Sequence, residues 1–162
     1  MAFDLNTFLS KVKTTASAVG TKVAETIRIN TPEAWSEEKQ YINAIVASMA
    51  LIVYADGIVE NEEVEAVIDT INNETVFKEF NATKEALEHY SIHIQNLTQA
   101  LMKSKAEYAL AVAKISTDIS RVKKQEWKEN IVNLCMKLAA ADGDMANDEL
   151  IMLNKIKISL NM

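Results

Sequence analysis

Apolar residues recur every three or four positions along most of the 162-residue chain, which is the spacing of amphipathic helices. Residues 83–103 are an example, because Leu87, Tyr90, Ile94, Leu97 and Leu101 fall on one helical face. The same spacing predicts helices that start near positions 33 and 61, and others over residues 105–120, 124–140 and about 147–160. Together with a helix in residues 1–30, the pattern predicts seven helices.

The composition narrows the fold class. Hydrophobic residues make up 49% of the chain and charged residues 25%, and there are only three glycines and one proline. Few residues are therefore suited to the tight turns of a sheet protein, while helix formers are plentiful. The sequence predicts one all-α domain, a compact helical bundle with short loops.

The first thirty residues differ from the rest. Phe8, Val12, Val19 and Ile27 form an apolar stripe with lysines interleaved, and the Thr31-Pro32 step marks a boundary before a domain at residues 31–162. Residues 1–30 are expected either to contact a membrane surface or a partner helix, or simply to pack on the domain or fray. No apolar stretch approaches the length of a membrane span, and the N-terminus lacks the apolar core of a secretory signal.

The net charge and the cysteine content indicate which partners and which cellular compartment to expect. The net charge is −6, and an acidic surface repels phosphate backbones, so nucleic acid is not expected as a partner. The single cysteine, Cys135, sits at a regular apolar position and is predicted to be a buried thiol. A cytoplasmic protein is expected.

An internal repeat with an offset of 86 residues is the most informative feature. Residues 45–71 match residues 131–157 in their apolar pattern and in an Ala-Asp-Gly corner followed by a glutamate that opens the next helix. The matched acids are Asp56 with Asp142, and Glu63 with Glu149. Two similar helical hairpins are expected to face each other about a pseudo-twofold axis.

These acids have two interpretations. In the structural one, glycine allows the positive φ that ends a helix, and acids at the next helix N-terminus are favoured by its dipole. In the functional one, Asp56, Glu63, Asp142 and Glu149 share a divalent cation, with Glu62, Asp144 and Asp148 as further candidates. The Asp-Gly to Glu spacing equals the second half of an EF-hand loop, but the first half has no carboxylates. Carboxylates brought together raise one another's pKa, so a metal or a basic partner is expected if they converge.

The paired motifs YADGIVENEEVEAV and AAADGDMANDELIML, with the lysine-bearing amphipathic segment TFLSKVKTTASAV, resemble the TerB family of tellurite-resistance proteins and the related domain of a DnaJ-like co-chaperone. This resemblance implies a bundle of about seven helices, a role in tellurite resistance and stress response, and divalent metal binding through the four matched acids. It also implies TerC-like and TerD-like partners at a membrane. In place of the family's capping serines the chain has Glu60, Asn61, Ala146 and Asn147, of which asparagine can still cap a helix.

A second candidate metal site lies on the helix over residues 83–103. Glu85, His89 and His93 are spaced by four residues, so they share one helical face that could hold zinc. A solvated polar stripe explains the same residues.

Three functions remain open. The first is a non-enzymatic module that binds calcium, magnesium, zinc or a partner through the acidic corners. The second is a protein-interaction adaptor at the membrane without metal, and the third is a small metal-dependent enzyme, which requires the histidines to lie near the acids.

Overall fold

The computed structural model describes residues 6–8, 34–141 and 145–162, and within these residues the chain is helical with no strand. The all-α fold is thereby confirmed. The helices are α3 (Glu37–Val53), α4 (Asn61–Asn73), α5 (Thr75–Glu79), α6 (Thr83–Lys103), α7 (Lys105–Ile119), α8 (Gln125–Ala139) and α9 (Asn147–Ser159).

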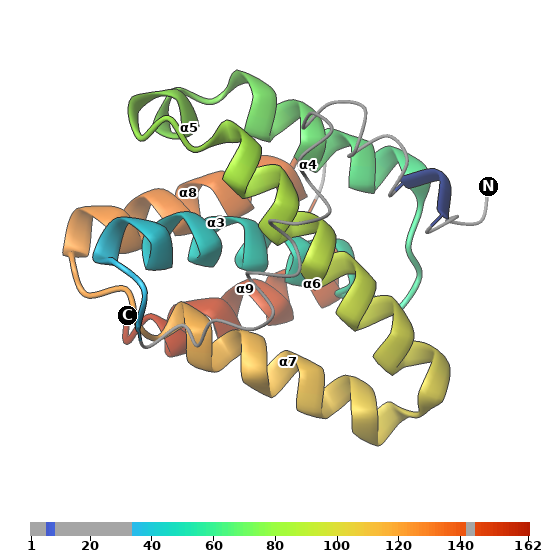
Figure 1. Ribbon diagram of the computed structural model, residues 1–162. Coiled ribbons are helices and arrows are strands. Elements are labelled where there is room, and N and C mark those ends of the chain that lie inside the picture. Colours follow the sequence, from blue (N-terminus) through green and yellow to red (C-terminus); the bar gives the residue numbers. More distant parts are fainter. Residues whose placement is uncertain (1–5, 9–33, 142–144) are drawn as a thin grey trace.

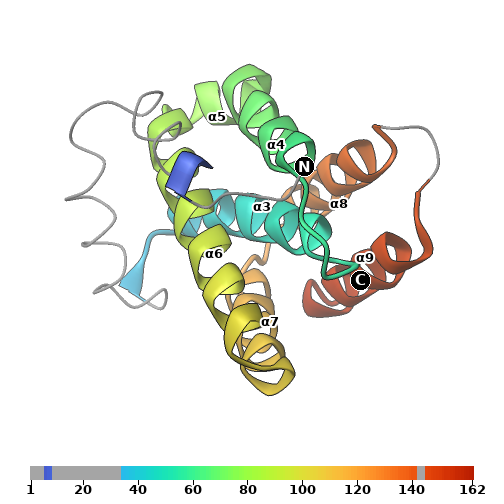
Figure 2. The same ribbon diagram turned by 90° about the vertical axis from the view of Figure 1, so that its right-hand side faces the viewer.

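Helix α3 is the centre of the bundle. Every residue from 41 to 53 is buried, and the helix packs against α4, α6, α7, α8 and α9 (Figures 1 and 2). A helix that is apolar on all sides is stable only when other helices surround it. The Ser36 side chain caps its first turn by accepting a hydrogen bond from the Lys39 backbone N–H at 3.2 Å.

Helices α6 and α7 form a long hairpin that packs on α3. One residue, Ser104, separates them, and its side chain accepts a hydrogen bond from the Glu107 backbone N–H at 3.1 Å. Capping of α7 by the residue that ends α6 explains why so short a connection suffices.

The repeat appears as two helical hairpins, α3–α4 and α8–α9, whose first helices pack against each other. Several matched positions are equally buried: Ile45 and Ile131 are fully buried, as are Met49 and Cys135. The predicted burial of Cys135 is thus confirmed. The two units differ at their second helices, because Val64 is 1% exposed whereas its match Leu150 is 46% exposed. Helix α4 also packs against α6, whereas α9 packs against α7 and α8.

The structure adds one helix that the apolar pattern does not predict. Helix α5 is a single turn between α4 and α6, and its Phe77 is fully buried in the core. A helix of five residues is too short for apolar periodicity to show. The central helix also starts at Glu37, later than the predicted start near position 33.

The two tryptophans are half-buried and lie against other rings. Trp127 stacks on Tyr41 with ring centroids 4.4 Å apart, and Trp35 meets His89 edge to face at 5.1 Å. Both rings therefore join segments that are distant in the sequence.

Of the amphipathic segment 1–30, the structure describes only residues 6–8, which are helical. Phe8 is 4% exposed and packs edge to face on Tyr90 of α6, with ring centroids 5.7 Å apart. At this position the apolar stripe therefore packs on the domain. The rest of the predicted helix lies outside the described residues. None of the helices that the structure describes is long and apolar enough to cross a membrane.

Candidate functional site

The first Asp-Gly corner follows α3 and has the predicted conformation. Gly57 has a φ of +75°, and its backbone N–H donates to the Tyr54 carbonyl oxygen at 3.0 Å. Asp56 Oδ1 accepts a hydrogen bond from the Ile58 backbone N–H at 2.9 Å, which fixes the side chain on its own turn. The aspartate and glycine therefore have the structural roles that their residue types suggest.

At the start of α4, Glu63 Oε2 accepts a hydrogen bond from the Glu60 backbone N–H at 3.3 Å. This contact is the glutamate half of a capping box, so Glu63 also stabilises the helix N-terminus. The asparagines expected to cap do not occupy the N-cap positions: Asn61 and Asn147 are the first residues of α4 and α9, the N-cap residues are Glu60 and Ala146, and the Ala146 side chain forms no capping hydrogen bond.

The second corner is described only in part. Helix α8 ends at Ala139, the Ala141 backbone N–H donates to the Leu138 carbonyl oxygen at 3.2 Å, and α9 begins at Asn147. Asp142 and Asp144, two of the predicted metal ligands, lie outside the described residues.

Glutamates from the two repeats line one pocket, which we call the acid pocket. It has a volume of about 220 Å³. Its acidic residues are Glu60, Glu62 and Glu63 at the start of α4 and Glu149 at the start of α9. Its apolar walls are formed by Ile52, Val53, Ala66, Leu138 and Ala141. The folded chain thus brings together three of the predicted residues, Glu62, Glu63 and Glu149.

Glu63 has the most perturbed carboxyl group of the acid pocket. The pKa of Glu63 is raised from its ordinary value of 4.5 to about 7; burial is the largest cause, and the negative charges of Asp56, Glu60 and Glu149 contribute to the rise. The hydrogen bond from the Glu60 backbone lowers the pKa but does not offset these effects. The carboxyl group is therefore close to half-protonated near neutral pH and would ionise fully next to a positive charge.

The other predicted acids of the two repeats that the structure describes, Asp56 and Asp148, are not among the residues that line the pocket. Asp56 is exposed on its turn, close enough to raise the pKa of Glu63, and Asp148 is exposed at the start of α9. Within the residues that the structure describes, no three His, Cys, Asp or Glu side chains are arranged to hold a metal ion. The predicted four-acid set is accordingly seen only in part.

The histidine face of α6 is neither a solvated stripe nor a three-ligand metal site. His89 and His93 are 1% and 8% exposed. The side-chain oxygen of Asn43, in the buried centre of α3, accepts hydrogen bonds from His89 Nδ1 at 2.8 Å and His93 Nε2 at 2.7 Å. One ring nitrogen of His93 is therefore already engaged in a hydrogen bond inside the core, and burial lowers the pKa of His93 to about 3.

Glu85 and the acid pocket belong to separate places in the fold. Glu85 lines a different cavity, which shares no lining residue with the acid pocket. A joint centre of histidines and corner acids, which an enzyme with two metals would need, therefore finds no support among the described side chains.

Three residues of these sites were missed from the sequence. Glu60 lines the acid pocket, Asn43 joins the two histidines, and Glu88 is a buried glutamate of α6. The sequence does contain a signal for Asn43, because Asn43 and Ser48 are the two polar residues that interrupt the apolar run of α3 from residue 42 to residue 53. Glu60 and Glu88 differ from ordinary surface glutamates only through their tertiary neighbours.

Comparison with known proteins agrees with the all-α fold. The model of the family described as tellurite resistance protein TerB matches residues 43–162, which include α3 from Asn43 onward and every helix from α4 to α9. No curated protein and no solved structure matches the chain. Since the family match spans well over half of the sequence, the chain belongs to the TerB family of tellurite resistance proteins.

Proposed function

We propose that this protein is a non-enzymatic module that binds a divalent cation in its acid pocket. The observation that carries the proposal is that Glu63 and Glu149, which are equivalent positions of the two repeats, line one pocket. Helix capping alone does not require the two glutamates to share a pocket. A shared cation would require it.

The donor chemistry favours a hard cation. Among the described residues that line the acid pocket, the charged groups are all glutamates, so carboxylate oxygens are its strongest ligands. Calcium and magnesium prefer oxygen ligands, whereas zinc sites usually include nitrogen or sulfur. Glu63 and Glu149 would hold the ion with help from Glu60 and Glu62, and Asp56 and Asp142 would add negative charge from the corners.

Calorimetric titration with calcium, magnesium and zinc tests this proposal. Because Glu63 is partly protonated near neutral pH, binding should release protons, and the measured heat should change with the ionisation enthalpy of the buffer. The double variant Glu63→Gln, Glu149→Gln should lose the heat. The variant Glu129→Gln, which alters an exposed glutamate of α8, should retain it. If titration of the unaltered protein with each of the three ions gives no heat of binding, the proposal of a cation site is wrong.

A basic side chain of a partner protein is the second candidate occupant. The apolar walls formed by Ile52, Val53 and Leu138 favour it, because a lysine or arginine stem packs on apolar surface while its charged end meets the carboxylates. By the family resemblance, TerC-like and TerD-like proteins at a membrane are the partners to test, in a cytoplasmic response to tellurite and other stress. Co-purification that persists with a chelator and is lost in the Glu63→Gln, Glu149→Gln double variant would favour this occupant over a metal.

A further inference from the structure

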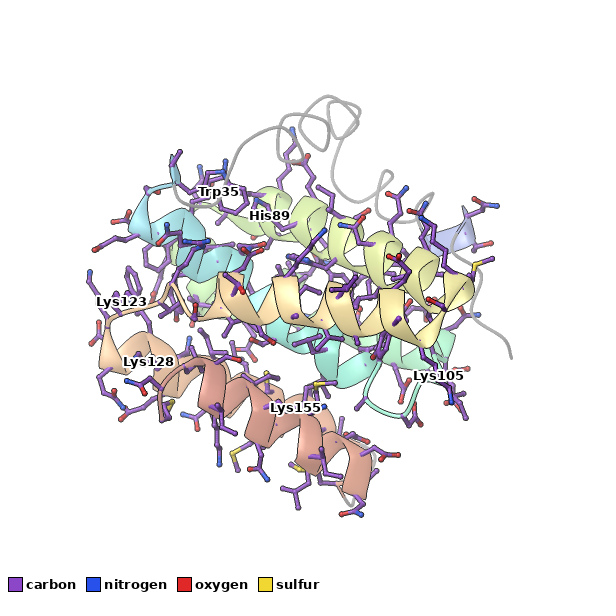
Figure 3. All side chains as sticks on the ribbon, turned by 90° about the horizontal axis from the view of Figure 1, so that it is seen from below. Trp35, His89, Lys105, Lys123, Lys128 and Lys155 are labelled. Atoms are coloured by element: carbon purple, nitrogen blue, oxygen red, sulfur yellow. The ribbon has the colours of Figure 1, made fainter. Side chains whose placement is uncertain are left out.

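A second cavity lies between the N-terminal turns of α3 and α6, and we call it the α3–α6 cavity. Its volume is about 610 Å³. Glu85 and Glu88 of α6 and Lys39 and Ile42 of α3 contribute to its lining, together with Phe80 after α5. Figure 3 shows Trp35 and His89 next to each other at this end of the bundle.

Glu88 is the exceptional residue of this cavity. The residue is 3% exposed, and both of its carboxylate oxygens are buried without a hydrogen-bond partner. Burial raises the pKa of Glu88 as a consequence. Burying a carboxylate without hydrogen-bond donors is energetically unfavourable. Such a group normally has a partner, supplied by the protein itself or by a bound molecule.

His89 adds an acceptor next to the cavity. Its Nδ1 is bound to the Asn43 side-chain oxygen, so in the neutral ring Nδ1 carries the hydrogen and Nε2 has a lone pair. Burial lowers the pKa of His89, which favours that neutral ring. Nε2 is buried without a hydrogen-bond partner and lies 3.5 Å from Glu85 Oε1. With the ring neutral, Nε2 and Glu85 Oε1 are therefore two acceptors that face each other.

An organic cation fits these features better than a metal ion does. An ammonium group offers three N–H donors and a positive charge, which complement the unpartnered oxygens of Glu88 and the half-buried carboxylate of Glu85. The cavity is much larger than a single ion, and Ile42 and Phe80 provide apolar wall for a carbon chain. The part of the chain that the structure describes holds no set of three metal-binding side chains here.

The lysines at the rim meet this charge requirement only in part: Lys39 helps to lower the pKa of Glu85 and Lys84 partly offsets the rise in the pKa of Glu88, but the Glu88 oxygens receive no hydrogen bond from the described residues. Lys39 Nζ lies 4.8 Å from the centre of the Trp35 ring, so its charge is directed at that ring. Lys84 is exposed one helical turn before Glu88, and the Glu88 oxygens have no hydrogen bond to it.

We propose that the α3–α6 cavity binds an organic cation with an ammonium group and an alkyl chain, and that Glu88 and Glu85 receive the ammonium group. This site is separate from the acid pocket and does not depend on it.

The test uses the full chain in the presence of a chelator, with 1,5-diaminopentane as the probe and 1,5-pentanediol as its neutral counterpart. The diamine should bind and the diol should not. Glu88→Gln should weaken diamine binding by about tenfold, the range expected for loss of a charge-assisted hydrogen bond. Glu129→Gln, which removes the same charge from an exposed position of α8, should leave the affinity within about twofold.

Two further measurements test the proposal even if the Glu88→Gln variant does not fold. Glu85→Gln, at a half-buried position, should weaken binding in the same direction. In the unaltered protein, diamine should shift the NMR signals of the His89 ring. The proposal is overturned if diamine and diol behave alike, if Glu129→Gln weakens binding as much as the cavity variants, or if the cavity takes zinc and not the diamine.

Discussion

Replacing Glu63 by glutamine should stabilise the protein at alkaline pH when no cation is bound. The pKa of Glu63 is about 7 in the folded chain against an ordinary value of 4.5, so ionisation is less favourable in the folded state than in the unfolded state. Each pH unit of difference corresponds to about 1.4 kcal/mol, which sets an upper bound of roughly 3 kcal/mol. Because the side chain is only partly buried, solvent screening reduces the expected gain to about 1–2 kcal/mol.

The sign and the pH window follow from the raised pKa. Below about pH 4.5 the carboxyl group is protonated in both states and the substitution should have no effect on the free energy of unfolding. Between about pH 4.5 and 7 the glutamate is ionised in the unfolded chain but still protonated in the folded chain. The free energy of unfolding of the unaltered protein therefore falls as the pH rises through this range. Above about pH 7 the difference between variant and unaltered protein should be constant. Glutamine can still accept the Glu60 backbone hydrogen bond, so the helix cap is preserved.

Urea denaturation of chelator-treated protein from about pH 4 to about pH 9 measures this difference. Glu62→Gln is the matched control, because this exposed neighbour lines the same pocket, and its effect should stay below about 0.5 kcal/mol. A saturating cation should reverse the order, since it stabilises the unaltered protein and not the variant. The reasoning is refuted if Glu63→Gln is neutral or destabilising at alkaline pH without a cation, or if its effect is independent of pH.

Other consequences can be checked separately. Asn43→Ala should lower the free energy of unfolding by about 2–4 kcal/mol in urea denaturation, because two buried histidine N–H groups lose their acceptor, whereas Asn133→Ala at an exposed position of α8 should change it little. The ring of His93, with a pKa of about 3, should stay neutral in an NMR titration down to about pH 4. Because the ring in the unfolded chain takes up its proton near pH 6.5, His93 should lower the free energy of unfolding as the pH falls from about 6.5 to about 3. Phe77→Ala should cost about 3–5 kcal/mol while exposed Lys78→Ala costs little, and equal effects would contradict the core role of α5. Asp56→Asn with Asp142→Asn should weaken calcium, magnesium or zinc binding in calorimetry, because negative charge is lost near the acid pocket, and should leave the helical content in circular dichroism unchanged; unchanged affinity would show that the corner charges do not assist binding.

Much of the helical architecture was readable from the chain alone. Helix α6 has the bounds expected from the spacing of Leu87, Tyr90 and Ile94, and the turn after Asp56 has the positive φ expected of Gly57. Periodicity and turn chemistry are local properties, so the residues themselves determine them. The repeat could likewise be found by aligning the chain with itself, and it pointed to Glu63 and Glu149 as equivalent positions.

Tertiary structure alone decided which of these residues meet and in what surroundings. An apolar face shows that a helix is covered but not by which neighbour, so Val64 and Leu150 match in sequence yet only Val64 is buried. The same holds for charge: Glu63, Glu88 and exposed Glu62 are alike in sequence, and they differ because burial removes water from some carboxylates and not from others. The sequence determined the helices and the equivalent acids. The packing of α3 against its neighbours determined the acid pocket, the Asn43–histidine cluster and the α3–α6 cavity. These sites depend on tertiary structure because desolvation and proximity arise only when distant segments come together.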